Sequence, residues 1–457
     1  MKSKRLNLLV FLLIGVFIYN VNAVTPPKYG SVIRYAIFQN SISLDPIKIL
    51  TFTERCIADS IFDGLVRHGQ DGVISPCLAS SWEISEDQKV YTFHVTESAK
   101  FHNGRIITAN DVKFSWERSI KLADKSILKQ SKLELISDAD SFRSEKVNDV
   151  SGLKVLDNNS IQVSLEQADS SFLEGLTTPP AWIVPKESVQ KSDFSQHPIG
   201  SGPFKCASST GAEGEIIHLE AYEEYLLGRP YLDGIVFILA PDFDTALLLF
   251  ETDELDCLEI PGIEFDGRFR NDPEWSSQLS SIANNQLVYI QVNRKAFPVK
   301  TKLVDVLKYG IDVKSILEML YNQGKSITSD YQPEKAKKLN VEFQGKPIKL
   351  IFLDSDYDAV KIADRIAFDL MEIGVRISVN PINRQDFQKA INDKLFSLAL
   401  QITPQSSKDT KILDTDPYVP LFYKNMNMLQ KPELQDLSDS TQNGILQFDN
   451  MYLLHLK

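Results

Sequence analysis

The alternation of apolar and polar positions along the chain predicts an α/β protein. Residues 29–38, YGSVIRYAIF, form a largely apolar run that predicts a first strand. Residues 52–66 carry apolar side chains at helical spacing, with glycines near the end of the run, and predict a helix. Two alternating runs, at 82–84 and 90–95, are separated by the polar residues SEDQK and predict a β-hairpin.

Residues 101–120, FHNGRIITANDVKFSWERSI, have the pattern of a turn followed by a capped helix. Asn and Gly tolerate the positive φ that a tight turn needs, so His102-Asn103-Gly104 predicts a turn. Thr108, with Asp111 three residues later, predicts a helix cap. The apolar side chains that then share one helix face are Val112, Trp116 and Ile120. This stretch is therefore expected to be scaffold.

The second half of the chain alternates strand and helix patterns. The predicted order is a strand at 348–353, a helix at 359–373, a strand at 375–379, a helix at 387–391 and a strand at 395–402. A β-α-β-α-β order requires parallel neighbouring strands with right-handed crossovers. In such open sheets, ligands bind beyond the carboxyl ends of the strands. The loops at 354–356 and 381–385 are therefore candidate parts of a binding site.

The N-terminus has the pattern of a secretory signal peptide. Basic residues precede an apolar run at 6–19, which is shorter than the roughly 20 residues needed to span a bilayer. Small residues follow, and cleavage is expected after Ala23, so residues 1–23 are assigned to the signal peptide. No cysteine follows closely enough to carry a lipid anchor, and the mature protein is expected in the periplasm. The alternative is an uncleaved membrane anchor.

The net charge limits the partners that are expected, and the chain length predicts how many subdomains there are. The chain has 49 basic and 61 acidic residues, a formal net charge of −12, and removal of the signal peptide makes this charge more negative. Such a chain is not expected to bind nucleic acid or anionic lipid through bulk charge. A length of 457 residues exceeds what one hydrophobic core usually serves, so two or three subdomains are expected.

Four cysteines form an even set in a chain expected in an oxidising compartment. Cys206 and Cys257 each lie in a strand-like run, and neighbouring strands would bring them together, so they are the favoured disulfide pair. Cys56 and Cys77 would then pair by elimination. Buried free thiols are an equally open alternative for this second pair.

Catalytic and metal-binding motifs are not found. The chain has no G-x-S-x-G, H-E-x-x-H, P-loop or G-x-G-x-x-G string. Two S-x-x-K strings, at 126–129 and 188–191, lack the partner motifs of penicillin-binding enzymes. His94 and His102 have no third ligand nearby, so no metal site is predicted. No enzymatic activity and no cofactor are predicted.

Several segments, in order, resemble the family 5 extracellular solute-binding proteins, which include oligopeptide, dipeptide and nickel receptors of ABC importers. The signature block of that family resembles residues 74–85, 91–95, 100–104 and 107–115 of this chain. Further similar segments are residues 60–66, 197–205, 231–237, 288–293, 419–423 and the pair Lys431-Pro432. Together they cover almost all of the mature chain.

The resemblance implies a two-lobed periplasmic binding protein fold of type II, similar to cluster C. The large lobe would comprise residues 24–285, with an accessory subdomain at about 52–185. The small α/β lobe would comprise residues 286–412. Residues 413–457 would return to complete the large lobe. Hinges are expected near 284–293 and 410–420.

The function implied is that of a monomeric periplasmic receptor that encloses an oligopeptide between its lobes and delivers it to a membrane-embedded ABC permease. Alternatives are a receptor for a metal chelate, haem or a glycan, and an exported hydrolase or peptide-holding chaperone. The segment before Val419 is shorter than in the family, where it commonly carries an acidic anchor for the peptide amino terminus. Asp414 or Asp416 is a candidate substitute.

Five residues are candidate ligand contacts. Glu54 precedes the core of the first predicted helix, where the family lays its backbone beside the ligand, and the alternative is a solvated charge at the helix N-terminus. Tyr289 and Asn293 border the expected lobe crossing and are candidates to face the cleft, with hinge packing or a turn as the alternative. Tyr423 resembles an aromatic residue of the cleft, with core packing as the alternative. Asp356 is a candidate at a strand end, with helix capping as the alternative.

Overall fold

The computed structural model describes most of the chain after its N-terminal segment. The described residues are 29–38, 42–49, 51–69, 73–210, 216–297, 302–320, 324–327, 330–339, 347–404, 418–435, 441–442, 445–446, 448–449 and 451–453. The predicted signal peptide at 1–23 and the candidate anchors Asp414 and Asp416 lie outside the described residues. Among the described helices, none is long and apolar enough to cross a bilayer.

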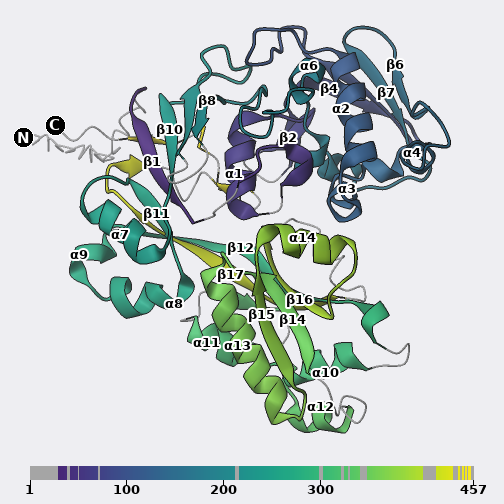
Figure 1. The fold of residues 1–457 in the computed structure, drawn as a ribbon. Coiled ribbons are helices and arrows are strands. Elements are labelled where there is room, and N and C mark those ends of the chain that lie inside the picture. Colours follow the sequence, from purple (N-terminus) through teal and green to yellow (C-terminus); the bar gives the residue numbers. More distant parts are fainter. Residues whose placement is uncertain are drawn as a thin grey trace, which may run out of the picture.

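One 11-stranded sheet runs through both lobes, in the order β15-β14-β16-β12-β17-β11-β1-β10-β9-β8, with β13 also paired to β17. Figure 1 shows the large lobe above, the small lobe below, and β12 and β17 crossing between them. The strands are β1 (Val32–Ile37), β8 (Phe204–Thr210), β9 (Ile216–Ala221), β10 (Gly234–Leu239), β11 (Cys257–Ile260), β12 (Leu279–Val292), β13 (Gly324–Ser326), β14 (Ile348–Leu353), β15 (Ile377–Ile382), β16 (Leu398–Pro404) and β17 (Tyr418–Gln430).

The large lobe is built on β1 and β8 to β11, with a helix on each face. The first predicted strand is confirmed as β1, which pairs in parallel with β10. Helix α1 (Phe52–Ile61) packs on one face, and α7 (Phe243–Glu251) packs on the other. Each helix is N-capped by a side chain, from Thr51 and Asp242 respectively, which satisfies backbone N–H groups that have no partner within the helix.

Helix α1 ends at Ile61, earlier than its predicted end at residue 66. The backbone N–H of Gly202 donates to the carbonyl oxygen of Ile61 at 2.8 Å. The next residue, Phe62, is extended, with a φ of −121°. A Cβ on Gly200 would lie 2.0 Å from the same carbonyl oxygen, so only glycine permits this approach. The glycine loop therefore ends the helix, which local periodicity could not indicate.

The accessory subdomain is a four-stranded sheet, β4-β5-β7-β6, covered by helix α2. Its elements are β4 (Ala79–Ile84), β5 (Val90–Val95), β6 (Leu153–Val155), β7 (Ser160–Ser164) and α2 (Ala109–Leu122). The predicted hairpin is confirmed, because β4 and β5 pair antiparallel. The predicted cap is also confirmed, since Thr108 and Asp111 form a capping box. Val112, Trp116 and Ile120 are all 0% exposed, as their shared face predicted.

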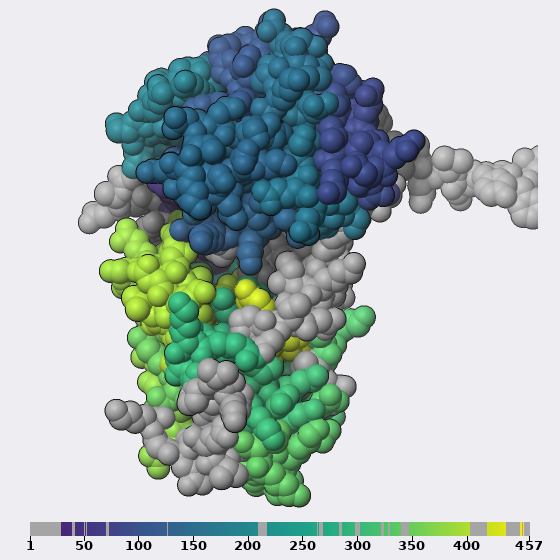
Figure 2. Space-filling model, turned by 90° about the vertical axis from the view of Figure 1, so that its right-hand side faces the viewer, coloured from purple at the N-terminus to yellow at the C-terminus, as the bar shows by residue number. Residues whose placement is uncertain are grey.

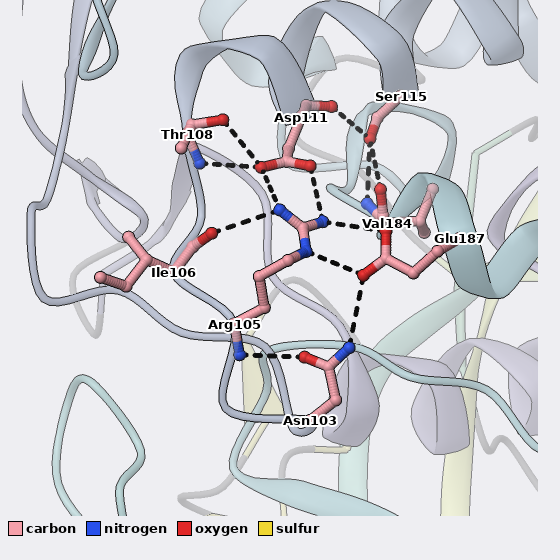
Figure 3. A network of polar contacts seen from close by, with 8 residues as sticks. All are labelled: Asn103, Arg105, Ile106, Thr108, Asp111, Ser115, Val184 and Glu187. Atoms are coloured by element: carbon pink, nitrogen blue, oxygen red, sulfur yellow. Dashed lines mark hydrogen bonds and ion pairs between the residues drawn. The ribbon is translucent and has the colours of Figure 1, made fainter.

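Arg105 holds the turn and the start of α2 together (Figure 3). Its guanidinium donates to both carboxylate oxygens of Asp111, at 3.0 and 2.7 Å, and to Glu187 at 2.8 Å. Asn103 donates to Glu187, which lies in the short helix α6 (Lys186–Val189). Thr108 donates to Asp111 through its backbone and its hydroxyl, at 2.9 Å each. The polar side chains of this stretch are therefore engaged in scaffold contacts.

The small lobe contains the predicted β-α-β-α-β unit. Strand β14 pairs in parallel with both β15 and β16, which confirms the parallel arrangement. Its helices are α10 (Leu303–Gly310), α11 (Val313–Met319), α12 (Pro333–Leu339), α13 (Tyr357–Glu372) and α14 (Arg384–Asn392). Helices α10, α11 and α13 pack in one core, whereas α14 packs on the opposite face around Ile351, Phe387 and Ala399. Gly374, at φ +84°, follows α13 as predicted.

The remaining elements are short and connect these units. The helical ones are η1 (Pro46–Lys48), α3 (Lys125–Ser131), η2 (Leu133–Leu135), α4 (Ala139–Arg143), α5 (Phe172–Gly175), η3 (Pro179–Ala181), α8 (Gly262–Glu264), the π-helix η4 (Phe265–Arg270), α9 (Pro273–Ser276) and η5 (Arg294–Ala296). The strands are β2 (Val66–His68), β3 (Ile74–Pro76), β18 (Leu434–Gln435), β19 (Thr441–Gln442), β20 (Ile445–Leu446) and β21 (Tyr452–Leu453).

Two long strands join the lobes. Strand β12 pairs with β16 of the small lobe over Gln286 to Val292, and with β17 along most of its length. Strand β17 continues to pair with β11 of the large lobe. The β12/β17 register shifts between Ile282 and Gln286, at the point where the chain passes from one lobe to the other. The predicted lobe boundaries at 285/286 and 412/413 stay predictions, and the second falls outside the described residues.

The predicted disulfide between Cys206 and Cys257 is wrong. Cys206 lies on β8 and Cys257 on β11, and three strands separate β8 from β11 in the sheet. At a spacing of about 4.8 Å, four steps between strands place them roughly 19 Å apart, whereas a disulfide needs Cα atoms within about 7 Å. Cys56 and Cys77 are not joined in a disulfide either, and the Cys77 thiol donates to Asp63 at 3.3 Å.

Candidate functional site

Two helices of the small lobe begin at the edge that faces the large lobe. Helices α13 and α14 follow β14 and β15, whose carboxyl ends lie at this edge because the strands are parallel. Asp356 caps α13 by accepting from the Ala359 N–H at 2.9 Å. Asn383 caps α14 by accepting from the Asp386 N–H at 3.0 Å. The predicted loops at 354–356 and 381–385 therefore both meet the lobe junction.

Helix α14 contacts the large lobe through two side chains of one face. The guanidinium of Arg384 donates to the carboxylate of Glu54 and, at 2.8 Å, to the carbonyl oxygen of Lys48. Gln388 donates to Asp124 at 2.7 Å. Residues four apart on a helix point the same way. Figure 1 places α14 beneath α1 and α3, and Figure 2 shows the yellow-green α14 region directly beneath the blue underside of the large lobe.

Glu54 is held rigidly in this contact. Its side chain is fully buried and completes the capping box of α1, accepting from the Thr51 N–H at 3.2 Å. The same carboxylate accepts from the Ser43 N–H at 2.8 Å. The alternative considered for Glu54, a solvated charge at the helix N-terminus, is wrong as to exposure, because the buried side chain caps the helix and forms an ion pair to the other lobe. Contact between Glu54 and a ligand stays a prediction.

A recess of about 480 Å³ lies beside the α14 contact. The large lobe contributes most of its lining, and Gln388 contributes from α14. Arg118 and Asp45 form a buried bidentate pair in its wall, at 3.0 and 2.7 Å. The recess therefore combines a charged wall from the large lobe with a side chain from the small lobe.

The sheet face beyond α14 carries tyrosine and glutamine side chains. The Tyr289 hydroxyl donates to Gln401 at 2.9 Å, and Gln401 donates to Gln291 at 2.6 Å. The ring of Tyr289 meets that of Tyr418 edge to face, with 5.8 Å between centroids. Tyr289 and Tyr423 belong to one apolar cluster. The structure therefore brings these two predicted site residues together, although their contact with a ligand stays a prediction.

Asn293 supports the small lobe from within. Its amide donates to the carbonyl oxygens of Lys394 and Phe396, both at 2.7 Å. Its side-chain oxygen accepts from the Lys295 N–H at 3.1 Å, and the residue is 6% exposed. These bonds correspond to the turn role considered for Asn293. A ligand contact for this residue stays a prediction that these bonds do not favour.

On the other side of the junction, the start of α13 meets the large lobe. The Tyr357 hydroxyl accepts from the Phe243 N–H at 3.0 Å, and its ring meets Phe38 edge to face at 5.9 Å. Asp358 accepts from the Gly262 N–H at 3.1 Å. Among the described residues, the lobes therefore touch at the start of α13 and at the start of α14.

A charged cluster lies beside the α13 contact. The Lys424 ammonium is 2.5 Å from Asp358, and these side chains are 7% and 1% exposed. Burial opposes its charge, but Asp358, Asp356 and Glu259 raise the pKa of Lys424 above the ordinary value. Burial raises the pKa of Asp356, and it raises the pKa of Glu259 to about 7 against the opposing effect of Lys424. Asp356 therefore combines helix capping with membership of this cluster.

Sequence reasoning missed several residues at the junction. Arg384 lies in the predicted loop at 381–385, so the strand-end rule pointed to its location without naming it. Gln388 lies one turn after Arg384 on the same face of α14. The sequence prediction did not show this, because it started the helix three residues too late, after the cap at Asn383 and after Arg384. Lys424 sits within a largely apolar strand, and no local signal identifies its partner Asp358.

Two lobes joined by crossing strands, with contacts across the space between them, define the class of two-lobed solute-binding proteins. The sequence profile of the bacterial extracellular solute-binding proteins, family 5 Middle, matches residues 73–428. The chain therefore belongs to this family of binding proteins, as the resemblance predicted.

The curated relatives of this chain are named for different ligands. Heme-binding protein A of Haemophilus influenzae is 28% identical over 359 residues, which is 69% of this chain and 63% of that protein. The nickel-binding periplasmic protein of Escherichia coli is 24% identical over 450 residues, covering 86% and 82%. The periplasmic oligopeptide-binding protein OppA of Salmonella typhimurium is 35% identical over 313 residues, covering 64% and 54%. The chain thus spans less than two thirds of the first and third of these relatives.

Solved structures share the fold. DppA of Helicobacter pylori, in complex with the peptide STSA, has a TM-score of 0.78 at 18% identity, covering 93% of this chain and 98% of that chain. The murein tripeptide binding protein MppA of Escherichia coli has a TM-score of 0.77 at 17% identity, covering 94% and 99%. The two-lobed α/β architecture predicted from the resemblance is therefore confirmed.

Proposed function

We propose that this protein is the periplasmic receptor of an ABC importer and that it captures an extended peptide between its two lobes. It acts as a monomer without catalysis or cofactor, and it hands its ligand to a membrane-embedded permease. Ligand that touches both lobes favours closure by a hinge motion at β12 and β17. The observation that carries the proposal is that polar side chains of both lobes meet at the start of α14, while strands β12 and β17 cross between the lobes.

Peptide is the favoured ligand because of the chemistry of the sheet face. The Tyr289–Gln401–Gln291 chain offers uncharged donors and acceptors, and the tyrosine rings offer flat apolar contact. Such a surface suits a ligand recognised mainly through its main chain, which needs few fixed side-chain contacts. The relatives named for oligopeptides and the neighbour bound to STSA support the same choice.

A thermal-shift screen of the ligand-free protein tests the proposal. A ligand that binds only the folded state adds about 2.7 kcal/mol of stability at 100 times its Kd, so the melting temperature rises with ligand concentration. We expect a rise with mixed di- to pentapeptides. If the melting temperature rises with haem or with a nickel complex but not with any peptide, the ligand would instead be of the kind for which one of these two relatives is named. Release of product from a peptide or ester substrate would contradict the receptor proposal.

A further inference from the structure

Helix α14 contacts the large lobe directly, through side chains of its own. Arg384 reaches across the junction to Glu54 and to the Lys48 carbonyl oxygen, and its side chain is only 15% exposed. Gln388 adds a bond to Asp124, one helical turn further along. All three acceptors belong to the large lobe, while both donors belong to α14. These bonds are therefore made only while the lobes are together.

Glu54 makes this contact favourable for closure. Its carboxylate is already oriented by the Ser43 and Thr51 N–H groups, so little side-chain freedom is lost when Arg384 arrives. An ionised donor and acceptor in buried surroundings form stronger hydrogen bonds than neutral groups do. When the lobes separate, water reaches both groups and Glu54 keeps its backbone donors. The open state is thus tolerated, but the closed state gains the pair.

We propose that the contacts of Arg384 and Gln388 with the large lobe, called the latch below, stabilise the closed arrangement of the lobes before ligand binds. The latch sets the ratio of closed to open receptor. Since the binding-competent fraction scales the apparent affinity, it also adjusts the affinity for whatever the lobes enclose. Its part in transport rests on the proposed function, whereas the contact itself is made by residues of this chain alone.

Small-angle X-ray scattering of the mature, ligand-free protein tests the latch. Bound solutes are removed by unfolding and refolding before measurement. Arg384→Gln removes the charged donor. Glu54→Gln removes the charged acceptor, and its single amide oxygen can still accept from the Thr51 N–H of the capping box, although the Ser43 N–H then loses its acceptor. Lys389→Gln is the matched control, because Lys389 lies on the same helix and is exposed. Gln388→Ala removes only the second contact.

We expect the wild-type protein and Lys389→Gln to be compact. Arg384→Gln and Glu54→Gln should both increase the radius of gyration, with the closed-to-open ratio falling about tenfold, as expected for one charge-assisted hydrogen bond. The double variant should open no further than Arg384→Gln alone, because that variant already removes the ion pair with Glu54. Gln388→Ala should open the protein less. If Arg384→Gln does not refold, Arg384→Lys is measured instead and should open partly, because one ammonium cannot replace the two-acceptor guanidinium contact.

Scattering curves for Arg384→Gln and Glu54→Gln that superimpose on the wild-type curve would overturn the latch. An open wild-type protein in the absence of ligand would also overturn it. Neither result depends on ligand identity. The peptide proposal is tested separately, by the thermal-shift screen. If that screen fails, a wild-type protein that is compact and opens on Arg384→Gln would still support the latch.

Discussion

The Lys424 ammonium lies 2.5 Å from the Asp358 carboxylate, so a strand that crosses between the lobes is tied to the first turn of a small-lobe helix. Both side chains are almost fully buried, and Asp358 also accepts from the Gly262 backbone of the large lobe. The junction on the α13 side is therefore held by a buried ion pair, whereas the junction on the α14 side is held by a pair that separation of the lobes exposes to water.

Asp358→Asn is expected to destabilise the fold. It leaves the Lys424 ammonium buried without its nearest counter-charge, and losing one partner of a buried pair costs about 3 kcal/mol. Asparagine can still accept from Gly262, so the loss reports the ion pair. The measurement is the free energy of unfolding from urea denaturation. Asp364→Asn, at an exposed position on the same helix, should change this energy by less than about 0.5 kcal/mol, and equal losses for the two variants would refute the assignment.

Asp63→Asn is expected to change the pH dependence of stability. Burial raises the pKa of Asp63 to about 6 from an ordinary 3.8, although hydrogen bonds from Cys77 and Tyr225 oppose the rise. The folded state therefore holds its proton more tightly than the unfolded state. As pH rises from about 4 through 6, ionisation of Asp63 therefore lowers the free energy of unfolding by up to about 3 kcal/mol.

Asparagine does not titrate, so the variant should gain stability relative to the wild-type protein as pH rises through this window. Urea denaturation at several values between pH 4 and 7 checks the difference between the two proteins. Taking the difference cancels the contributions of groups common to both. A constant difference across the window would show that Asp63 ionises in the folded state as it does in the unfolded state.

Tyr289→Phe is expected to weaken ligand binding more than folding. The variant loses the bond that orients the Gln401 amide, while the ring contact with Tyr418 is retained. One such hydrogen bond contributes about 1 kcal/mol, so the Kd should rise roughly fivefold. Isothermal titration with a peptide selected in the thermal-shift screen measures this change. Tyr331→Phe, on the small-lobe surface, should bind like the wild-type protein, and unchanged binding by Tyr289→Phe would remove Tyr289 from the site.

Arg105→Gln is expected to destabilise the accessory subdomain without affecting binding. It breaks the bidentate contact with Asp111 and the contact with Glu187, but Arg105 is 37% exposed, so the loss is about 1–2 kcal/mol. Thermal unfolding measures the loss, and peptide titration should give the wild-type Kd. Exposed Lys125→Gln is the control for charge removal. A raised Kd for Arg105→Gln alone would assign this network to ligand binding.

The sequence by itself determined the elements whose causes are local. The cap formed by Thr108 and Asp111 depends on residues three apart, and the strand and helix periods of residues 348–402 depend on short windows. The parallel order of β14, β15 and β16 follows from the intervening helices. The strand-end rule then located the loop that contains Arg384. These features needed no knowledge of distant contacts.

Only the tertiary structure decided which distant groups meet. Arg384 and Glu54 are 330 positions apart, and no local pattern encodes their pairing. The cysteine prediction failed for the same reason, because the strand order places three strands between Cys206 and Cys257. Helix α1 ended early because Gly202, in a loop far downstream in the sequence, bonds the carbonyl group of Ile61. Periodicity and capping act within a few residues, whereas strand order and lobe closure depend on the packing of the whole chain.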